Sequence, residues 1–152
     1  MLRSIAALGI LSFSVTLFAA CEGEVTCESG PGACACENDE CVLECGDGCS
    51  PDCRAFDVCR PTCQNGCEIA CEQGGECDAH CGVDCDVQCS KVASCNATCG
   101  SDCRFTCQDT ADCTVKAGPG ARVICLRVDS CNITCEGDCV VSCTSTAECG
   151  IT

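Results

Sequence analysis

Cysteine recurs in this chain with a strict period of 18 residues. From Cys41 to Cys107, four consecutive sets hold four cysteines each, spaced four residues apart, and each set begins 18 residues after the previous one. The register continues without insertion or deletion to Cys149, so six repeats and the start of a seventh fill residues 41–152. A register this strict is typical of a stacked repeat array, in which every unit must superpose on its neighbour.

The cysteines also dominate the composition. They number 27 among 152 residues, whereas the chain has four Phe and no Trp or Tyr. Such a content is typical of a disulfide scaffold or a metal–thiolate protein, and a core this poor in large apolar side chains needs covalent or metal staples. The formal net charge of −15 argues against binding to nucleic acid or other polyanions, and it helps to keep a cysteine-rich chain soluble.

Each repeat contains two segments of the form Cys-x-apolar-x-Cys, for example "CDVQC" and "CRFTC". Side chains at i, i+2 and i+4 lie on one face of a β-strand. Gly and Asp recur between the two segments, as in "GDG", "GVD" and "GSD", which favours a short turn with positive φ. The longer second connection, "QDTAD" in the fourth repeat, is polar.

These patterns predict an all-β chain, folded as a disulfide-stapled parallel β-solenoid with one coil per 18 residues and with little regular secondary structure beyond short strands. The alternative is a helical stripe of the same spacing, which the recurring Gly, Asp and β-branched residues oppose. An 18-residue coil also suits a three-sided cross-section, so the cross-section and the handedness stay open. Pro51 and Pro61 predict that the first two coils are irregular or edge-like.

The fifth repeat discriminates between disulfide pairings, because Ala117 and Ala121 replace its second and third cysteines. Losing both leaves no orphan thiol if those two positions pair across the short turn. Cysteines four apart in one strand lie about 13 Å from each other, whereas a disulfide needs Cα atoms about 5.5 Å apart, so bridges must close turns or link coils. The main alternative pairs the first cysteine with the fourth in the same coil and would leave Cys149 unpaired.

The expected pairing has two series. The short-turn bridges are Cys45–Cys49, Cys63–Cys67, Cys81–Cys85, Cys99–Cys103 and Cys135–Cys139. The long-turn bridges join the fourth cysteine of one coil to the first of the next, as Cys53–Cys59, Cys71–Cys77, Cys89–Cys95, Cys107–Cys113, Cys125–Cys131 and Cys143–Cys149. Two further bridges, in a pairing that the spacing leaves open, use Cys27, Cys34, Cys36 and Cys41. Thirteen bridges then use every cysteine except Cys21.

Residues 1–20 have the pattern of a secretory signal, with one basic residue, an apolar run from Ile5 to Leu17 and two small residues before Cys21. The run is too short and too weakly flanked to be a stable membrane span. The segment resembles the lipobox of bacterial lipoproteins, although Phe18 stands where that family usually has Leu. The resemblance implies that Cys21 is lipidated and that the protein lies in the cell envelope or on the outer surface. Cleavage after Ala20, with an extracellular product, is the alternative.

The expected organisation is a signal peptide over residues 1–20, a lipid tether and N-terminal cap over 21–40, and a six-coil repeat domain over 41–152. The array resembles disulfide-stapled β-solenoids. His80 is the single histidine, and the sequence has no nucleophile elbow, phosphate-binding loop or zinc-helix motif. We therefore expect no enzyme activity, no cofactor and no metal.

The expected function is that of an exported structural or binding module, anchored to the membrane through its lipid, with a protein or carbohydrate ligand. The C-terminal "CGIT" offers almost no cap, which indicates end-to-end self-association or a very short final coil.

Three other binding functions are alternatives. Metal–thiolate storage resembling metallothionein relies on clustered Cys-x-Cys pairs, and the chain has one, Cys34-Ala35-Cys36. Calcium could bind carboxylates that share a turn position, which are Asp84, Asp102 and Asp138 at one position and Glu76, Asp112 and Glu148 at another. A threonine column resembles that of insect ice-binding proteins but is interrupted by Glu44, His80 and Lys116.

Overall fold

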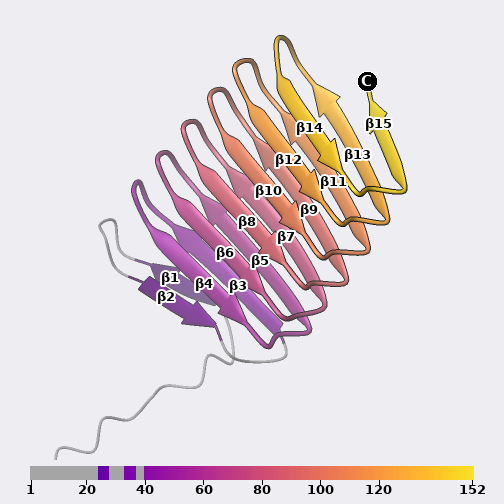
Figure 1. Ribbon diagram of the computed structural model, residues 1–152. Coiled ribbons are helices and arrows are strands. Elements are labelled where there is room, and N and C mark those ends of the chain that lie inside the picture. The colour runs from indigo at the N-terminus through magenta and orange to yellow at the C-terminus, as the bar shows by residue number, and fades with distance from the viewer. Residues whose placement is uncertain (1–23, 28–32, 37–39) are drawn as a thin grey trace, which may run out of the picture.

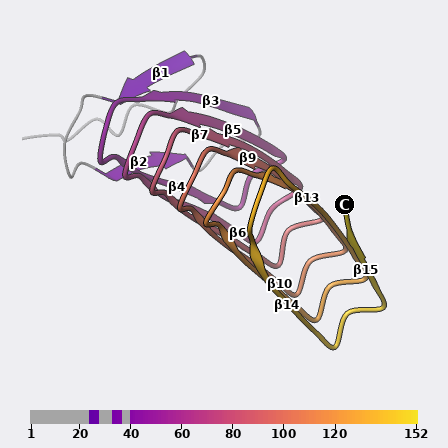
Figure 2. The same ribbon diagram turned by 90° about the horizontal axis from the view of Figure 1, so that it is seen from above.

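The computed structural model describes residues 24–27, 33–36 and 40–152, which form two parallel β-sheets and no helix (Figure 1). The chain passes from one sheet to the other and back in every repeat, so each repeat builds one coil. The sheets lie on opposite sides of the coil, which therefore has two faces rather than three (Figure 2). The predicted parallel β-solenoid with 18-residue coils is confirmed.

Neighbouring strands pair in register. The eight-stranded sheet is ordered β1 (Glu24–Cys27), β3 (Glu40–Cys45), β5 (Val58–Cys63), β7 (Glu76–Cys81), β9 (Ser94–Cys99), β11 (Asp112–Ala117), β13 (Ser130–Cys135) and β15 (Glu148–Ile151). The seven-stranded sheet is ordered β2 (Ala33–Cys36), β4 (Ser50–Arg54), β6 (Glu68–Glu72), β8 (Asp86–Ser90), β10 (Arg104–Gln108), β12 (Arg122–Leu126) and β14 (Val140–Thr144). Phe105, for example, lies between Val87 and Val123, each 18 positions away. The sequence period is therefore the register of the sheets.

Residues before Cys41 add one more coil to the solenoid. β1 pairs with β3 at the usual offset of 18, with Glu24 opposite Val42. β2 pairs with β4 at an offset of 17, since Ala33 lies opposite Ser50. This one-residue deletion conceals the coil from a search for a fixed period. The segment expected to be a tether and cap thus contributes two strands to the sheets, while the signal segment and Cys21 lie outside the described residues.

Pro51 and Pro61 do not make the first two coils irregular, contrary to the prediction. Each lies inside a strand, β4 or β5, and keeps its register with the preceding strand. Pairing with the following strand is interrupted locally, because proline has no N–H to donate. Both proline side chains are fully buried, so they take part in the core instead of interrupting it.

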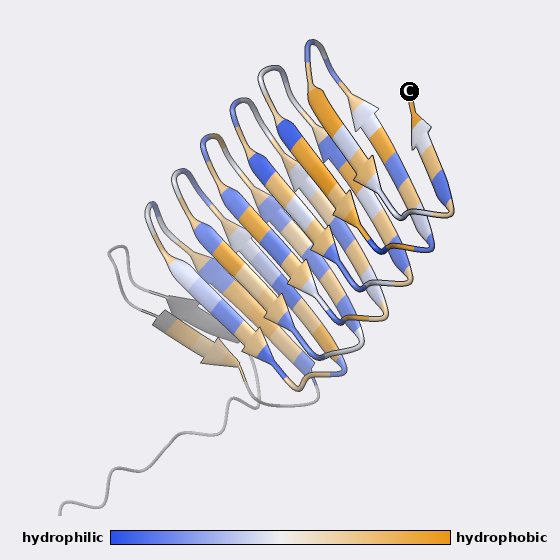
Figure 3. Cartoon of the chain, in the orientation of Figure 1, coloured by the Kyte–Doolittle hydropathy of each residue, from blue (hydrophilic) through white to orange (hydrophobic). Residues whose placement is uncertain are grey.

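The core between the sheets contains cysteine and one other residue per strand, with hydrophobic and hydrophilic residues alternating along the strands (Figure 3). The buried non-cysteine column of the eight-stranded sheet includes Leu43, Ala79, Ala97, Val115 and Ile133. The corresponding column of the seven-stranded sheet includes Ile69, Val87, Phe105 and Val123. Phe105 is the largest of the fully buried side chains.

The long turns carry a third buried column that the sequence did not reveal. Its members are Phe56, Val92, Thr110 and Val128, and Gly74 holds the equivalent place next to Phe56. The Thr110 hydroxyl donates a hydrogen bond to the Gln108 carbonyl at 3.1 Å, which satisfies this polar group in the core. The long turns are therefore packed corners rather than solvated loops.

Gly74→Ala is expected to lower the free energy of unfolding by about 1–3 kcal/mol, because overpacking displaces buried groups. A Cβ at this position would lie 2.5 Å from the ring of Phe56, which is 3% exposed. Guanidinium denaturation with the disulfides intact measures the change. Phe56→Leu in the same chain should recover part of the loss, and a variant as stable as the wild type would contradict this packing.

Each long turn also holds a non-glycine residue in the left-handed region, such as Ala55 at φ 52° and Lys91 at φ 56°. The N–H of Lys91 donates to the Gln108 carbonyl of the next coil at 3.0 Å, and Ala55 donates in the same way to Glu72. Hydrogen bonding between coils thus continues around the corner. The conformational cost of the left-handed residue is offset by this bond.

The C-terminal end of the solenoid is open within the described residues. All four residues of β15 are exposed, and Ile151, in a position that faces the core in other coils, is 58% exposed. Val140 on β14 is 61% exposed. In the part of the chain that the structure describes, no helix has the length and hydropathy to cross a membrane.

Candidate functional site

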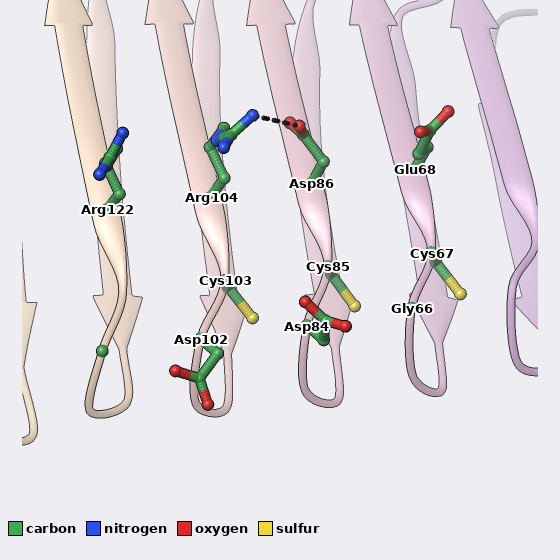
Figure 4. Close-up of a pocket in the computed structure, with 11 residues that line it drawn as sticks. Gly66, Cys67, Glu68, Asp84, Cys85, Asp86, Asp102, Cys103, Arg104 and Arg122 are labelled. Atoms are coloured by element: carbon green, nitrogen blue, oxygen red, sulfur yellow. Dashed lines mark ion pairs between the residues drawn. The ribbon is translucent and has the colours of Figure 1, made fainter.

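A groove of about 390 Å³ runs along the short turns, where the strands of the seven-stranded sheet begin (Figure 4). Four consecutive strands each place a charged residue there, in register with one another: Glu68, Asp86, Arg104 and Arg122. The short turns add Asp84 and Asp102, both in the left-handed region that the sequence predicts for these turns. Stacking of the repeat thus gathers residues that are 18 apart in the sequence into one site.

The charge changes sign along this groove. Glu68, Asp84 and Asp86 make one part acidic, whereas Arg104 and Arg122 make the next two coils basic. Arg104 Nη1 lies 3.7 Å from Asp86 Oδ2 at the boundary, and this pair is partly exposed to solvent. Among the described residues, Glu68 and Arg122 form no ion pair. The groove can therefore hold a ligand with a positive and a negative group at separate points.

Disulfides line the coils on both sides. The described residues contain ten, with Cα–Cα distances of 6.2–6.6 Å. The long-turn series coincides with the pairs that the sequence suggests, namely Cys53–Cys59, Cys71–Cys77, Cys89–Cys95, Cys107–Cys113, Cys125–Cys131 and Cys143–Cys149. The short-turn series contains Cys81–Cys85, Cys99–Cys103 and Cys135–Cys139. In the fifth repeat, the buried Ala117 and Ala121 occupy the place of a bridge.

The tenth disulfide, Cys36–Cys41, closes the long turn of the additional coil. It settles one of the pairings that the spacing leaves open. Cys34 is also disulfide-bonded, whereas the side chain of Cys27 lies outside the described residues.

Two expected short-turn bridges, Cys45–Cys49 and Cys63–Cys67, are not formed, which corrects the sequence-based pairing. Cys45, Cys63 and Cys67 are buried thiols. The physical reason is a competing contact, because Cys45 lies opposite Cys63 on the neighbouring strand and the two side chains are hydrogen-bonded across the coils. This hydrogen bond lowers the pKa of Cys45 against the effect of burial, and it raises the pKa of Cys63.

Sulfur atoms of successive coils approach one another within 4.8 Å in five groups, for example the Cys53–Cys59 bridge with Cys71. Every sulfur in these groups belongs to a disulfide. Because the thiolate rather than the disulfide sulfur is the metal ligand, thiolate coordination there would require the bridges to be reduced.

The alternative calcium positions are only partly brought together. Asp84 and Asp102 lie on adjacent short turns, and the next turn has Gly120 in the equivalent place. Glu76 and Asp112 are separated by Ser94, which pairs with both of them. The carboxylates of the second set therefore do not form a continuous column.

The threonine column of the eight-stranded sheet is interrupted as the sequence suggests. His80 lies between Thr62 and Thr98, and Lys116 lies between Thr98 and Thr134. The His80 side chain is 53% exposed and its Nε2 lies 3.4 Å from Asp78 Oδ1, so it belongs to the outer surface of the sheet.

Arg127→Gln is expected to raise the pKa of Asp109, which the bound Arg127 guanidinium lowers to about 2. Arg127 Nη2 donates to Asp109 Oδ2 at 2.8 Å across neighbouring long turns. Because the folded-state pKa is lowered, the pair favours folding above the usual carboxyl range, and this contribution disappears as the pH falls through about 2. An NMR titration of the Asp109 carboxyl measures the shift. Arg122→Gln, in the groove, should leave it unchanged, and equal titration of all three chains would contradict the pairing.

Comparison with known proteins finds no matching family model, no matching curated protein and no matching solved structure. The fold and its bridges therefore define the class of protein, which is a disulfide-stapled parallel β-solenoid. So many disulfides indicate that the chain folds in an oxidising environment.

Proposed function

We propose that this chain is an exported, lipid-anchored structural or binding module of the cell surface. The observation that carries the proposal is covalent closure of the coils, since six consecutive long turns from Cys53 to Cys149 each hold a disulfide. Rigidity obtained from bridges instead of a large apolar core suits a small domain outside the reducing cytosol. We expect no enzymatic activity and no cofactor.

The anchor rests on Cys21. The lipobox-like segment before it supplies the recognition pattern, and a thioether at Cys21 leaves an even number of cysteines in the remainder of the chain. A lipoprotein anchor carries two or three acyl chains, which hold a protein stably at a membrane, whereas one chain does not. The solenoid would then project from the membrane with its open C-terminal end outward.

The groove is the proposed ligand site. Its neighbouring acidic and basic stretches favour a zwitterionic surface of a protein or a charged carbohydrate over nucleic acid, which the chain's net charge of −15 would repel. The exposed strand edges β14 and β15 make end-to-end self-association a second mode of interaction.

Intact-mass spectrometry of the mature protein tests the anchor. The expected mass corresponds to a chain that begins at Cys21 and carries acyl groups. A control variant, Cys21→Ser, should lose the acyl mass and leave the membrane fraction in detergent partitioning. A mature chain that begins before Cys21, or one that begins there without acylation, would contradict the lipoprotein proposal.

A further inference from the structure

We propose that Cys45, Cys63 and Cys67 form a redox-active thiol site. Cys45 and Cys63 close a disulfide across two neighbouring coils, and Cys67 exchanges with it. The substrates are low-molecular-weight disulfides and thiols. This activity is separate from the anchoring and binding proposed above, and neither depends on it.

The register of the strands places these thiols together. Cys45 ends β3 and Cys63 ends β5, directly opposite each other in a parallel pair, and Cys67 follows at the next short turn. Adjacent strands are about 4.8 Å apart, which is within the Cα–Cα range that a disulfide spans. The side chains of Cys45 and Cys63 are hydrogen-bonded, and Cys63 also contacts Cys67. Cys49 completes the row through its hydrogen bond to Cys45.

The arrangement is a row of sulfurs along the axis of the solenoid. Among the described residues, the sulfur triplets that lie within 4.8 Å of one another belong to other coils. A structural zinc ion needs four ligands around one point, whereas disulfide exchange needs sulfurs in sequence, so the row fits exchange better than metal binding.

Cys45 has the features of the attacking thiol. It accepts the hydrogen bond of Cys63, which stabilises its thiolate, and the thiolate is the reactive form of cysteine. Cys45 and Cys63 are each 6% exposed, whereas Cys49 and Cys67 are each 1% exposed. A small disulfide therefore reaches Cys45 or Cys63 first, at the edge of the short turns.

The oxidation balances in two steps. The Cys45 thiolate attacks one sulfur of the small disulfide, forms a mixed disulfide and releases one thiolate. Cys63, after losing its proton, attacks the Cys45 sulfur, so that the Cys45–Cys63 bond forms and the second thiolate leaves. The two protein thiol protons are taken up by the two released thiolates, and the small disulfide gains the two electrons that the protein loses.

Exchange with Cys67 needs no oxidant. The Cys67 thiolate attacks Cys63, which forms Cys63–Cys67 and returns Cys45 to the thiolate. The in-turn and cross-coil bridges are therefore two closures of one site. Cys67 lines the charged groove and its thiol donates to the Gly46 carbonyl at 3.2 Å, so exchange changes the wall of the groove.

The test is a titration of the full chain in glutathione buffers of increasing oxidised fraction, quenched by alkylation and mapped by mass spectrometry. Cleavage before Asp47 and Asp52 separates Cys45 from Cys49, and fragmentation distinguishes Cys63 from Cys67. We expect a peptide with a Cys45–Cys63 bridge, formed under conditions in which the long-turn bridges stay closed throughout. Mapping only Cys45–Cys49 and Cys63–Cys67, with no alkylated thiol at any ratio, would overturn the proposal.

Two variants test the roles within the site. Cys45→Ser should abolish the reversible step, and Cys67→Ser should keep the Cys45–Cys63 bridge while removing its exchange to Cys63–Cys67. The matched control is Cys81→Ser with Cys85→Ser, which removes an equivalent short-turn bridge outside the site and should leave the step unchanged. The wild-type titration needs no variant to fold. A reversible step that persists in Cys45→Ser would assign the redox chemistry elsewhere and overturn the proposal.

Discussion

Full reduction under otherwise native conditions is expected to unfold the solenoid. Each small disulfide loop contributes about 2 kcal/mol by the chain-entropy relation, so ten described bridges amount to about 20 kcal/mol. Even half of that value is comparable with the whole free energy of unfolding of an ordinary domain, about 5–15 kcal/mol. The remaining core, one non-cysteine side chain per strand, cannot replace it. Far-ultraviolet circular dichroism and size-exclusion chromatography follow the loss of strands and the expansion of the chain.

The control for this experiment is a sample treated with the spent, oxidised reductant, which should keep its β-sheet spectrum. The reduced chain should be alkylated at once, so that bridges cannot re-form during the measurement. A fully reduced and alkylated chain that kept the native spectrum and elution volume would contradict a covalently held solenoid.

Phe105→Ala is expected to produce the largest loss of stability of any single apolar truncation, about 3–5 kcal/mol. Phe105 is 1% exposed and lies between Val87 on β8 and Val123 on β12. The strict register of the sheets prevents these neighbours from closing the cavity, because each is fixed by the strand beside it. Guanidinium denaturation with the disulfides intact measures the change.

Thr106→Ala is the matched control for this prediction, because Thr106 is the next residue on β10 and is less buried than Phe105. It should change the free energy of unfolding by no more than about 0.5 kcal/mol, as is usual for surface substitutions. Equal effects of the two substitutions would show that Phe105 does not face a packed interior.

Much of the fold can be predicted from the sequence because a parallel in-register solenoid converts a repeat length directly into strand pairing. The cysteine comb fixes the two strands of each coil, and the alternation around Val87 and Phe105 identifies the inward side. The fifth repeat gives the pairing rule, since Ala117 and Ala121 disappear from the cysteine pattern together and the structure places both in the core.

Other features depend on contacts that no repeat pattern encodes. The additional coil was not predicted because one deleted residue shifts Cys34 and Cys36 out of the 18-residue register. The packed long turns were not predicted because Phe56, Val92 and Thr110 share a position without sharing a chemical type. At Cys45, the alternative partner Cys63 lies on the neighbouring strand, so the choice between them is a property of the assembled sheets.

The charged groove could be predicted only in part. Asp84 and Asp102 are recognisable as turn residues of one repeat position, and the structure places them on adjacent short turns. The change from Glu68 and Asp86 to Arg104 and Arg122 is visible in the sequence once the register is known. That these residues line one groove follows only from the stacking of the coils.

The disulfide map of the oxidised protein between residues 53 and 149 tests the solenoid most directly. The account predicts peptides that join the fourth cysteine of each coil to the first of the next, from Cys53–Cys59 to Cys143–Cys149. Bridges between the first and fourth cysteines of one coil, such as Cys59–Cys71, together with an unpaired Cys149, would contradict it.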